Sequence, residues 1–281
     1  MKFGIKIHRG YDFTPFLKSS PSNIRKLSDL RVFGKTHQVF KQKIPFVKQG
    51  FEILACNQAE EEILDPKKDW KYYINEYNFR NSWELESTKP KIGFFGCSYT
   101  FGEGIHNDDM FVNIVSKELN MNPFNLGIGG AGSERIARTF AAAVKVIDFN
   151  YAVITLPDWS RQMHLDPQGK IINIIPAWPH RDYEKLNDLF LSVDDNFFIN
   201  QAITYINWIS DIAKSNGIKI ILSSHVCLVN KLCQLMFPEH TIDTFPNIDD
   251  QCARDKMHPG PKSQAAHAEQ IIKAFYDRNW I

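Results

Sequence analysis

Short apolar runs alternate with amphipathic stretches from Lys91 to the end of the 281-residue chain, and this alternation restricts the possible folds more than any other feature. The apolar runs have the length of buried strands and lie at 91–97, 123–128, 151–156 and 218–224. The stretches with helical spacing of apolar residues lie at 110–119, 133–147, 202–217 and 261–276. Strands joined by helices of this length form a parallel sheet that helices cover on both faces. We therefore expect an α/β fold.

Two parts of the chain do not follow this alternation. Residues 1–90 contain short mixed segments with several turn signals and no repeat, so we treat them as an N-terminal extension to which the pattern assigns no fold. Residues 91–281 form the α/β domain, with an insertion at about 160–196 that is rich in Pro, Asp, Trp and His. Long loops at the strand ends of such folds often shape binding sites.

Composition favours a chain that stays inside the cell. No apolar run reaches the roughly 18 to 20 residues that cross a bilayer, and the first residues lack the apolar core of a secretory signal. We therefore expect a cytoplasmic protein without membrane contacts. The 5 cysteines are scattered and form no C-x-x-C pair, which favours reduced thiols and predicts no metal site.

Positive charge is concentrated at the N-terminus. Residues 1–50 hold 11 of the 33 Lys and Arg but only 2 of the 32 Asp and Glu, although the net charge of the chain is +1. This pattern is typical of a solvated basic face packed on an acidic body, and a contact with a polyanion is the alternative. Because basic clustering alone is weak support, we do not expect nucleic acid as a partner.

The glycine-rich stretch GIGGAG, residues 127–132, fits the dinucleotide fingerprint G-x-G-x-x-G between a strand and a helix. That fingerprint also needs a carboxylate at the carboxyl end of the next strand, where it reaches the ribose. Asp148 has the right separation but precedes the strand at 151–156, so it lies at the opposite end. We therefore expect no nucleotide cofactor.

The stretch FFGCSYTFGEG, residues 94–104, follows the first expected strand and contains the candidate nucleophile. Ser98 comes directly after the strand, at the edge where a parallel sheet presents its ligand crevice. Cys97 should point to the other side by strand alternation, so we interpret it as a small buried hydrophobe. Flanking glycines let the backbone turn tightly. Ser98 is therefore the expected nucleophile.

A serine hydroxyl is a weak nucleophile until a base accepts its proton, and DKMHPG at 255–260 offers that base compactly. We expect Asp255 to orient and stabilise the imidazole of His258 within a turn closed by proline and glycine. The alternative is a helix-entry turn in which the two residues merely lie near the cap of the last helix.

Three blocks in this order resemble the SGNH (GDSL-like) hydrolase superfamily, including its microbial and phage members. Residues 96–102 are similar to the first block, G-D-S-x-x-x-G, with cysteine in place of the aspartate. Residues 125–130 are similar to N-x-x-x-x-G, and 255–259 match D-x-x-H-P. NEYNFRNS at 75–82 is similar to an Asn-then-Arg segment that often precedes the first block, which is a weaker signal. The resemblance spans 91–281 and implies a three-layer α/β/α sandwich with a parallel, flavodoxin-like central sheet.

The resemblance also implies roles for individual residues. Ser98 would be the nucleophile, His258 the base and Asp255 its orienter. The backbone N–H groups of Ser98 and Gly130 would donate to the oxyanion.

The third block of the family, G-x-N-D, is where this sequence departs from the pattern. Asp158 stands where the family has an asparagine donor, and an ionised carboxylate accepts hydrogen bonds instead. Ser160, Arg161 or Gln162 would then supply the third oxyanion donor, and Arg161 is the strongest candidate because it carries a fixed positive charge.

The implied activity is ester hydrolysis through an acyl-enzyme, with removal of small acyl groups such as acetyl from carbohydrate or related esters. The partner would be a small-molecule or glycan ester, with no metal and no cofactor. We expect Trp159 and Ser160 to contact the substrate, although packing of the insertion explains the tryptophan equally well.

Two other functions stay open. One is a catalytically degenerate SGNH domain that serves as a glycan-binding or structural module, which the departure at Asp158 favours. The other is an O-acyltransferase, in which the same triad would transfer the acyl group to a sugar if the site excludes water. If the chain is phage-encoded, we expect association with the virion.

Overall fold

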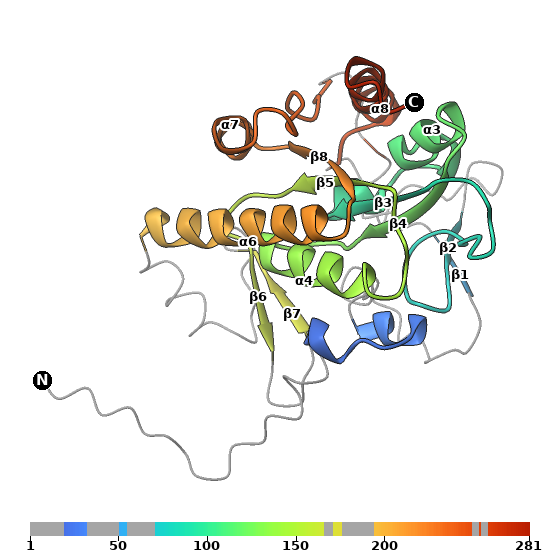
Figure 1. Cartoon of the computed structure of the whole chain (residues 1–281), viewed down its shortest axis with the longest axis horizontal. Helices are drawn as coiled ribbons and strands as arrows, with labels where there is room; N and C mark the ends of the chain where they lie inside the picture. The colour runs from blue at the N-terminus through green and yellow to red at the C-terminus, as the bar shows by residue number, and fades with distance from the viewer. Residues whose placement is uncertain are drawn as a thin grey trace, which may run out of the picture.

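A four-stranded parallel sheet forms the centre of the computed structural model, which describes residues 20–32, 51–54, 71–165, 171–175, 194–248, 253 and 258–281 (Figure 1). Its strands are β3 (Lys91–Gly96), β4 (Asn122–Gly127), β5 (Tyr151–Leu156) and β8 (Lys219–Ser224). They pair in the order β4-β3-β5-β8, and every pairing is parallel. The first two strands of the sequence alternation therefore lie side by side, with the third on the other flank of β3, as in a flavodoxin-like sheet.

Helices cover both faces of this sheet (Figure 1). On one face lie α4 (Ser133–Ala143) and α6 (Asp195–Ser215), and on the other α3 (Phe111–Glu118) and α8 (Pro261–Asp277). Side chains of β3 alternate accordingly: Phe95 packs with the first pair of helices, and Phe94 with the second. The predicted three-layer α/β/α sandwich with a parallel central sheet is confirmed.

The ends of the helices differ from the sequence predictions. Helix α6 begins at Asp195, seven positions before the expected 202, because Asp194 caps it by accepting a hydrogen bond from Asn196 N at 2.8 Å. Helix α4 ends at Ala143 instead of 147. A further helix, α7 (Cys227–Met236), follows β8 and was not predicted.

The remaining elements are short. Two antiparallel pairs form outside the central sheet, β1 (Phe51–Leu54) with β2 (Lys71–Ile74), and β6 (Gln162–Leu165) with β7 (Ile171–Ile174). Helix α2 spans Ser98–Phe101, and the 3-10 helices are η1 (Pro21–Asn23), η2 (Leu27–Val32) and η3 (Asn107–Asp109). No helix in the described part of the chain is long and apolar enough to span a bilayer.

The described part of the N-terminal extension packs on the α/β body. Phe79 is fully buried in the same core cluster as Phe95. Trp83 contacts Phe124 of β4, with ring centroids 5.3 Å apart, and the side chain of Asn122 donates to the Glu84 carbonyl at 2.6 Å. The segment that leads into β3 is therefore held against the edge strand β4.

Substitution of Gly127, at the end of β4, tests how closely α2 packs against this strand. A Cβ there would lie 2.3 Å from Phe101 N, so alanine would push α2 away from the sheet. We predict that Gly127→Ala lowers the free energy of unfolding by about 3 kcal/mol, measured by urea denaturation. In the control Gly217→Ala nothing lies within 4 Å and only the positive φ of +66° opposes the change, so the loss should be about 1 kcal/mol. Equal losses would contradict the close packing of α2 on β4.

Candidate active site

The carboxyl ends of three strands lie level at the edge of the sheet where Ser98 is found. Gly96 of β3 is in register with Gly127 of β4 and with Thr155 of β5. Ser98, two positions after Gly96, is the first residue of α2, and it is 5% exposed. A Cβ at position 96 would lie 2.1 Å from Thr100 Oγ1, so glycine allows α2 to begin directly against the strand. The loops after β4 and β5 leave the sheet at the same edge.

His258 contacts Ser98 across a sequence separation of 160 residues. Its Nε2 lies 2.7 Å from Ser98 Oγ, and its side chain is 14% exposed. The edge of its ring meets Tyr99, with ring centroids 5.7 Å apart and an interplanar angle of 72°. A hydrogen bond of this length and a largely desolvated imidazole are what proton transfer from serine to histidine needs.

Asp255, the predicted orienter of His258, lies outside the described residues, so its role stays a prediction. The structure places a different carboxylate beside the imidazole. Glu103 Oε2 lies 3.9 Å from His258 Nε2, and the glutamate side chain is only 8% exposed. Sequence reasoning missed this residue, although it stands in the same glycine-rich block as Ser98.

The loop that carries Glu103 is held by a buried arginine, Arg80, which is 0% exposed. Its guanidinium donates to backbone and side-chain oxygens of this loop: Phe101 O at 3.0 Å, Gly102 O, Ile105 O at 2.7 Å and Asn107 Oδ1 at 3.0 Å. Tyr72 Oη accepts from Gly104 N at 2.6 Å, and its ring lies 4.2 Å from the guanidinium carbon. The Glu103 backbone itself donates to Ser98 O at 3.1 Å. The loop therefore has a fixed backbone path.

Arg80 belongs to the stretch NEYNFRNS, which the sequence marked only weakly. Asn75 builds the turn of this stretch: its Oδ1 accepts from the backbones of Tyr77 and Phe79, and its Nδ2 donates to Asn81 O at 2.9 Å. The asparagine shapes the turn, and the arginine enters the loop beside the candidate nucleophile.

On the side of the expected oxyanion donors, two loops touch. Gly130 adopts a positive φ of 71°. A Cβ at Gly132 would lie 2.2 Å from the Arg161 carbonyl oxygen, so the loop after β4 packs directly on the turn after β5. Within that turn, Asp158 Oδ1 accepts from Ser160 N at 2.8 Å and from the Ser160 hydroxyl. The Ser160 hydroxyl is thus turned to Asp158.

Trp159 lies in the same turn and packs, partly buried, against the core cluster of α4 and α6. Its backbone carbonyl accepts from Gln162 Nε2 at 3.3 Å. Contact of its ring with a substrate stays a prediction. Among the described residues no group of three or more His, Cys, Asp and Glu is placed to hold a metal ion.

Cys97 is buried, as expected, but its surroundings are polar. Burial raises the pKa of its thiol. His225, Arg161 and the backbone of Tyr99 outweigh this effect through charge and hydrogen bonds, and they lower the pKa to about 6. The side chain is 0% exposed, so reagents cannot reach it without opening of the site.

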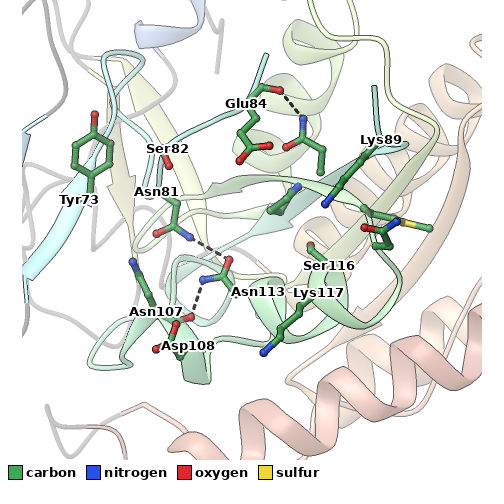
Figure 2. Close-up of a pocket in the computed structure, with 14 residues that line it drawn as sticks. Tyr73, Asn81, Ser82, Glu84, Lys89, Asn107, Asp108, Asn113, Ser116 and Lys117 are labelled. Carbon is green, nitrogen blue, oxygen red and sulfur yellow. Dashed lines mark hydrogen bonds between the residues drawn. The ribbon is translucent and has the colours of Figure 1, made fainter. Parts of the chain in front are cut away.

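A polar hollow of about 600 Å³ lies elsewhere, between the segment before β3, helix α3 and the start of β4 (Figure 2). Within it Asn81 donates to Asn113 at 3.3 Å, and Asn113 donates to the Asn107 carbonyl at 2.6 Å (Figure 2). None of its lining residues is a predicted site residue. We assign the chemistry to the edge of the sheet at Ser98, because Ser98 Oγ and His258 Nε2 lie 2.7 Å apart there.

Comparison with known proteins gives likenesses among solved structures only, since no protein-family model and no curated protein matches this chain. A member of the lipolytic protein G-D-S-L family from Veillonella parvula is 14% identical, with a TM-score of 0.42, over 66% of this chain and 98% of its own. The psychrotrophic esterase EstA from Pseudoalteromonas sp. is 11% identical, with a TM-score of 0.46, over 68% and 99%. Acetyl xylan esterase Est2A from the rumen bacterium Butyrivibrio proteoclasticus is 16% identical, with a TM-score of 0.43, over 76% and 70%.

Likenesses at such identities and TM-scores do not determine a reaction, so the function has to follow from the residues at the sheet edge.

A labelling experiment shows which of the two adjacent residues, Ser98 or Cys97, is the nucleophile. We predict that a fluorophosphonate probe labels Ser98 in the native protein and in Cys97→Ala, because Ser98 contacts His258 at 2.7 Å, whereas Cys97 is 0% exposed. Iodoacetamide should react instead with Cys227, which is exposed. Peptide mass spectrometry identifies the adducts, and a phosphonate found on Cys97 would contradict the assignment.

Proposed function

We propose that this chain is a serine ester hydrolase of the SGNH type, with Ser98 as nucleophile and His258 as base. The observation that carries the proposal is the 2.7 Å contact between Ser98 Oγ and His258 Nε2 at the carboxyl edge of a parallel sheet. Ligands of open α/β sheets bind at this edge. A buried hydroxyl paired with an imidazole is the activated-nucleophile arrangement of acyl transfer.

Acylation uses this pair directly. Ser98 Oγ attacks the ester carbonyl carbon while its proton passes to His258 Nε2, and the carbonyl π electrons move to the oxygen. The tetrahedral intermediate then collapses and breaks the bond to the alcohol oxygen, which takes the proton from Nε2. The products are the free alcohol and an ester of Ser98.

Deacylation repeats these steps with water. His258 Nε2 accepts a proton from the attacking water, whose oxygen bonds to the acyl carbon. Collapse of the second tetrahedral intermediate breaks the bond to Ser98 Oγ, which recovers the proton. The acid leaves and the site is restored.

The oxyanion of each intermediate would be held by the backbone N–H groups of Ser98 and Gly130. The contact of Gly132 with the Arg161 carbonyl supports a compact pocket, because it fixes the loop after β4 against the turn after β5. The Arg161 charge also acts on the thiol of Cys97, next to the nucleophile. Arg161 is therefore the proposed third donor, and Asp158 holds the turn through Ser160.

For the substrate we propose an ester of a small acyl group, such as acetyl, on a carbohydrate or a related alcohol. This choice follows the resemblance of the sequence blocks, and the names of two structural neighbours, an acetyl xylan esterase and a carbohydrate acetylesterase family member, agree with it. Trp159 is the proposed contact for the sugar.

The proposed function is tested by turnover of p-nitrophenyl acetate. Ser98→Ala should lower kcat/KM by about 10³-fold or more, whereas Ser116→Ala, which alters a buried serine on α3, should stay within about 3-fold. His258→Ala should remove most of the rate together with the fall of kcat/KM at acid pH, because neutral imidazole is the base. Full activity of Ser98→Ala would contradict the proposal, and absence of turnover in the wild type would favour a binding module.

The turn after β5 yields a second kinetic prediction. Arg161→Ala should lower kcat by about 10²-fold with a smaller change in KM, because an oxyanion donor acts mainly in the transition state. Asp158→Asn should be neutral or favourable, since the amide oxygen can still accept from Ser160 N while the amide nitrogen adds a donor. A silent Arg161→Ala together with an inactive Asp158→Asn would overturn the assigned roles.

A further inference from the structure

The carboxylate of Glu103 lies 3.9 Å from the candidate base His258, and its side chain is only 8% exposed. Burial disfavours a charged carboxylate unless an opposite charge or hydrogen bonds stabilise it. Arg80 supplies that charge: burial lowers its pKa to about 10, with opposing attraction from Tyr72 and Glu103, so the guanidinium stays protonated at neutral pH. Glu103 therefore interacts electrostatically with the Arg80 cation and lies 3.9 Å from the imidazole of His258.

We propose that Glu103 is a positioning residue of the active site that stabilises the protonated imidazole of His258 and so sets the pH below which Ser98 loses its base. The kinetic consequence rests on the proposed function, whereas the effect on His258 does not.

The geometry fixes which nitrogen is affected. Glu103 Oε2 approaches Nε2, the same atom that contacts Ser98 Oγ. When Nε2 is neutral it accepts the serine proton, and when it is protonated the positive charge of the imidazolium lies at ion-pair distance from the carboxylate. The expected role of Asp255 differs, because an orienter acts at the other ring nitrogen and fixes the tautomer.

The size of the effect follows from the charges around the ring. A carboxylate within about 4 to 6 Å favours the charged form of a histidine and so raises its pKa. Arg80 offsets part of this attraction, so we expect the loss of the carboxylate to shift the titration by about one unit. Other titratable groups nearby are Tyr72 against Gly104, Tyr99 against the His258 ring, His225 stacked on Tyr99, and Arg161, which acts on Cys97; Asp255 lies outside the described residues.

The loop backbone makes the effect a property of the fold. Arg80 and Tyr72 hold the backbone at 101–105, and the backbone N–H of Glu103 donates to Ser98 O. Since Ser98 and Glu103 belong to one short segment, the nucleophile and the carboxylate stay at fixed places relative to the same imidazole.

The test is an NMR titration of the His258 ring protons in the full chain, wild type against Glu103→Gln. The amide is isosteric but uncharged, so the pKa of His258 should fall by about one unit, and the acid limb of the kcat/KM profile should move by about one unit to lower pH. Glu118→Gln, which neutralises an exposed carboxylate on α3, should leave both midpoints in place. Glu103→Asp retracts the charge and should give an intermediate shift, which guards against misfolding of the amide variant.

An unchanged or raised His258 pKa in folded Glu103→Gln would overturn the inference. If the wild type lacks esterase activity but the titration shifts as expected, the proposed function fails and the role of Glu103 stands. If the wild type is active but both midpoints stay fixed in Glu103→Gln, the proposed function stands and the role of Glu103 fails.

Discussion

The in-register parallel pairing of β3 with both β4 and β5 is the constraint on which the site depends. It brings Gly96, Gly127 and Thr155 to one level, so three loops leave the sheet together. Because the glycine of β4 has no side chain, α2 can pack against the strand end, and Ser98 begins that helix. Helix α8, which follows His258, covers the face of the sheet on which Phe94 lies. This places the imidazole of His258 beside the Ser98 hydroxyl. The register of the sheet thus largely determines where Ser98 and His258 meet.

The second constraint is electrostatic and comes from outside the α/β alternation. Arg80 precedes the central sheet in sequence, yet it fixes the loop that follows the candidate nucleophile and attracts the charge of Glu103. A buried arginine without such acceptors would be strongly destabilising. The described part of the N-terminal extension therefore contributes to the candidate active site, and the proposed charge balance around His258 depends on it.

Periodicity predicted the fold because buried parallel strands and covering helices leave direct patterns in the sequence. The strand at 151–156 was predicted residue for residue. Ser98 was chosen as the candidate nucleophile because it follows the strand expected at 91–97. Glu103 was missed because the sequence does not show that its side chain is buried, and a glutamate between two glycines is typical of an exposed turn. The start of α6 was missed because a cap at Asp194 outweighs the weak apolar pattern before 202. The contact of Arg80 with residues more than twenty positions away is tertiary and has no local signal.

The central claim is that Ser98 carries the acyl group during turnover. The most direct measurement is mass spectrometry of the full chain, quenched in acid during hydrolysis of p-nitrophenyl acetate and then digested. The account predicts one acetyl group on the peptide that contains Ser98, fragment ions that place it on the serine and not on Cys97, and no such group in Ser98→Ala. Turnover without any acetylated Ser98, or acetyl found on the cysteine, would contradict it.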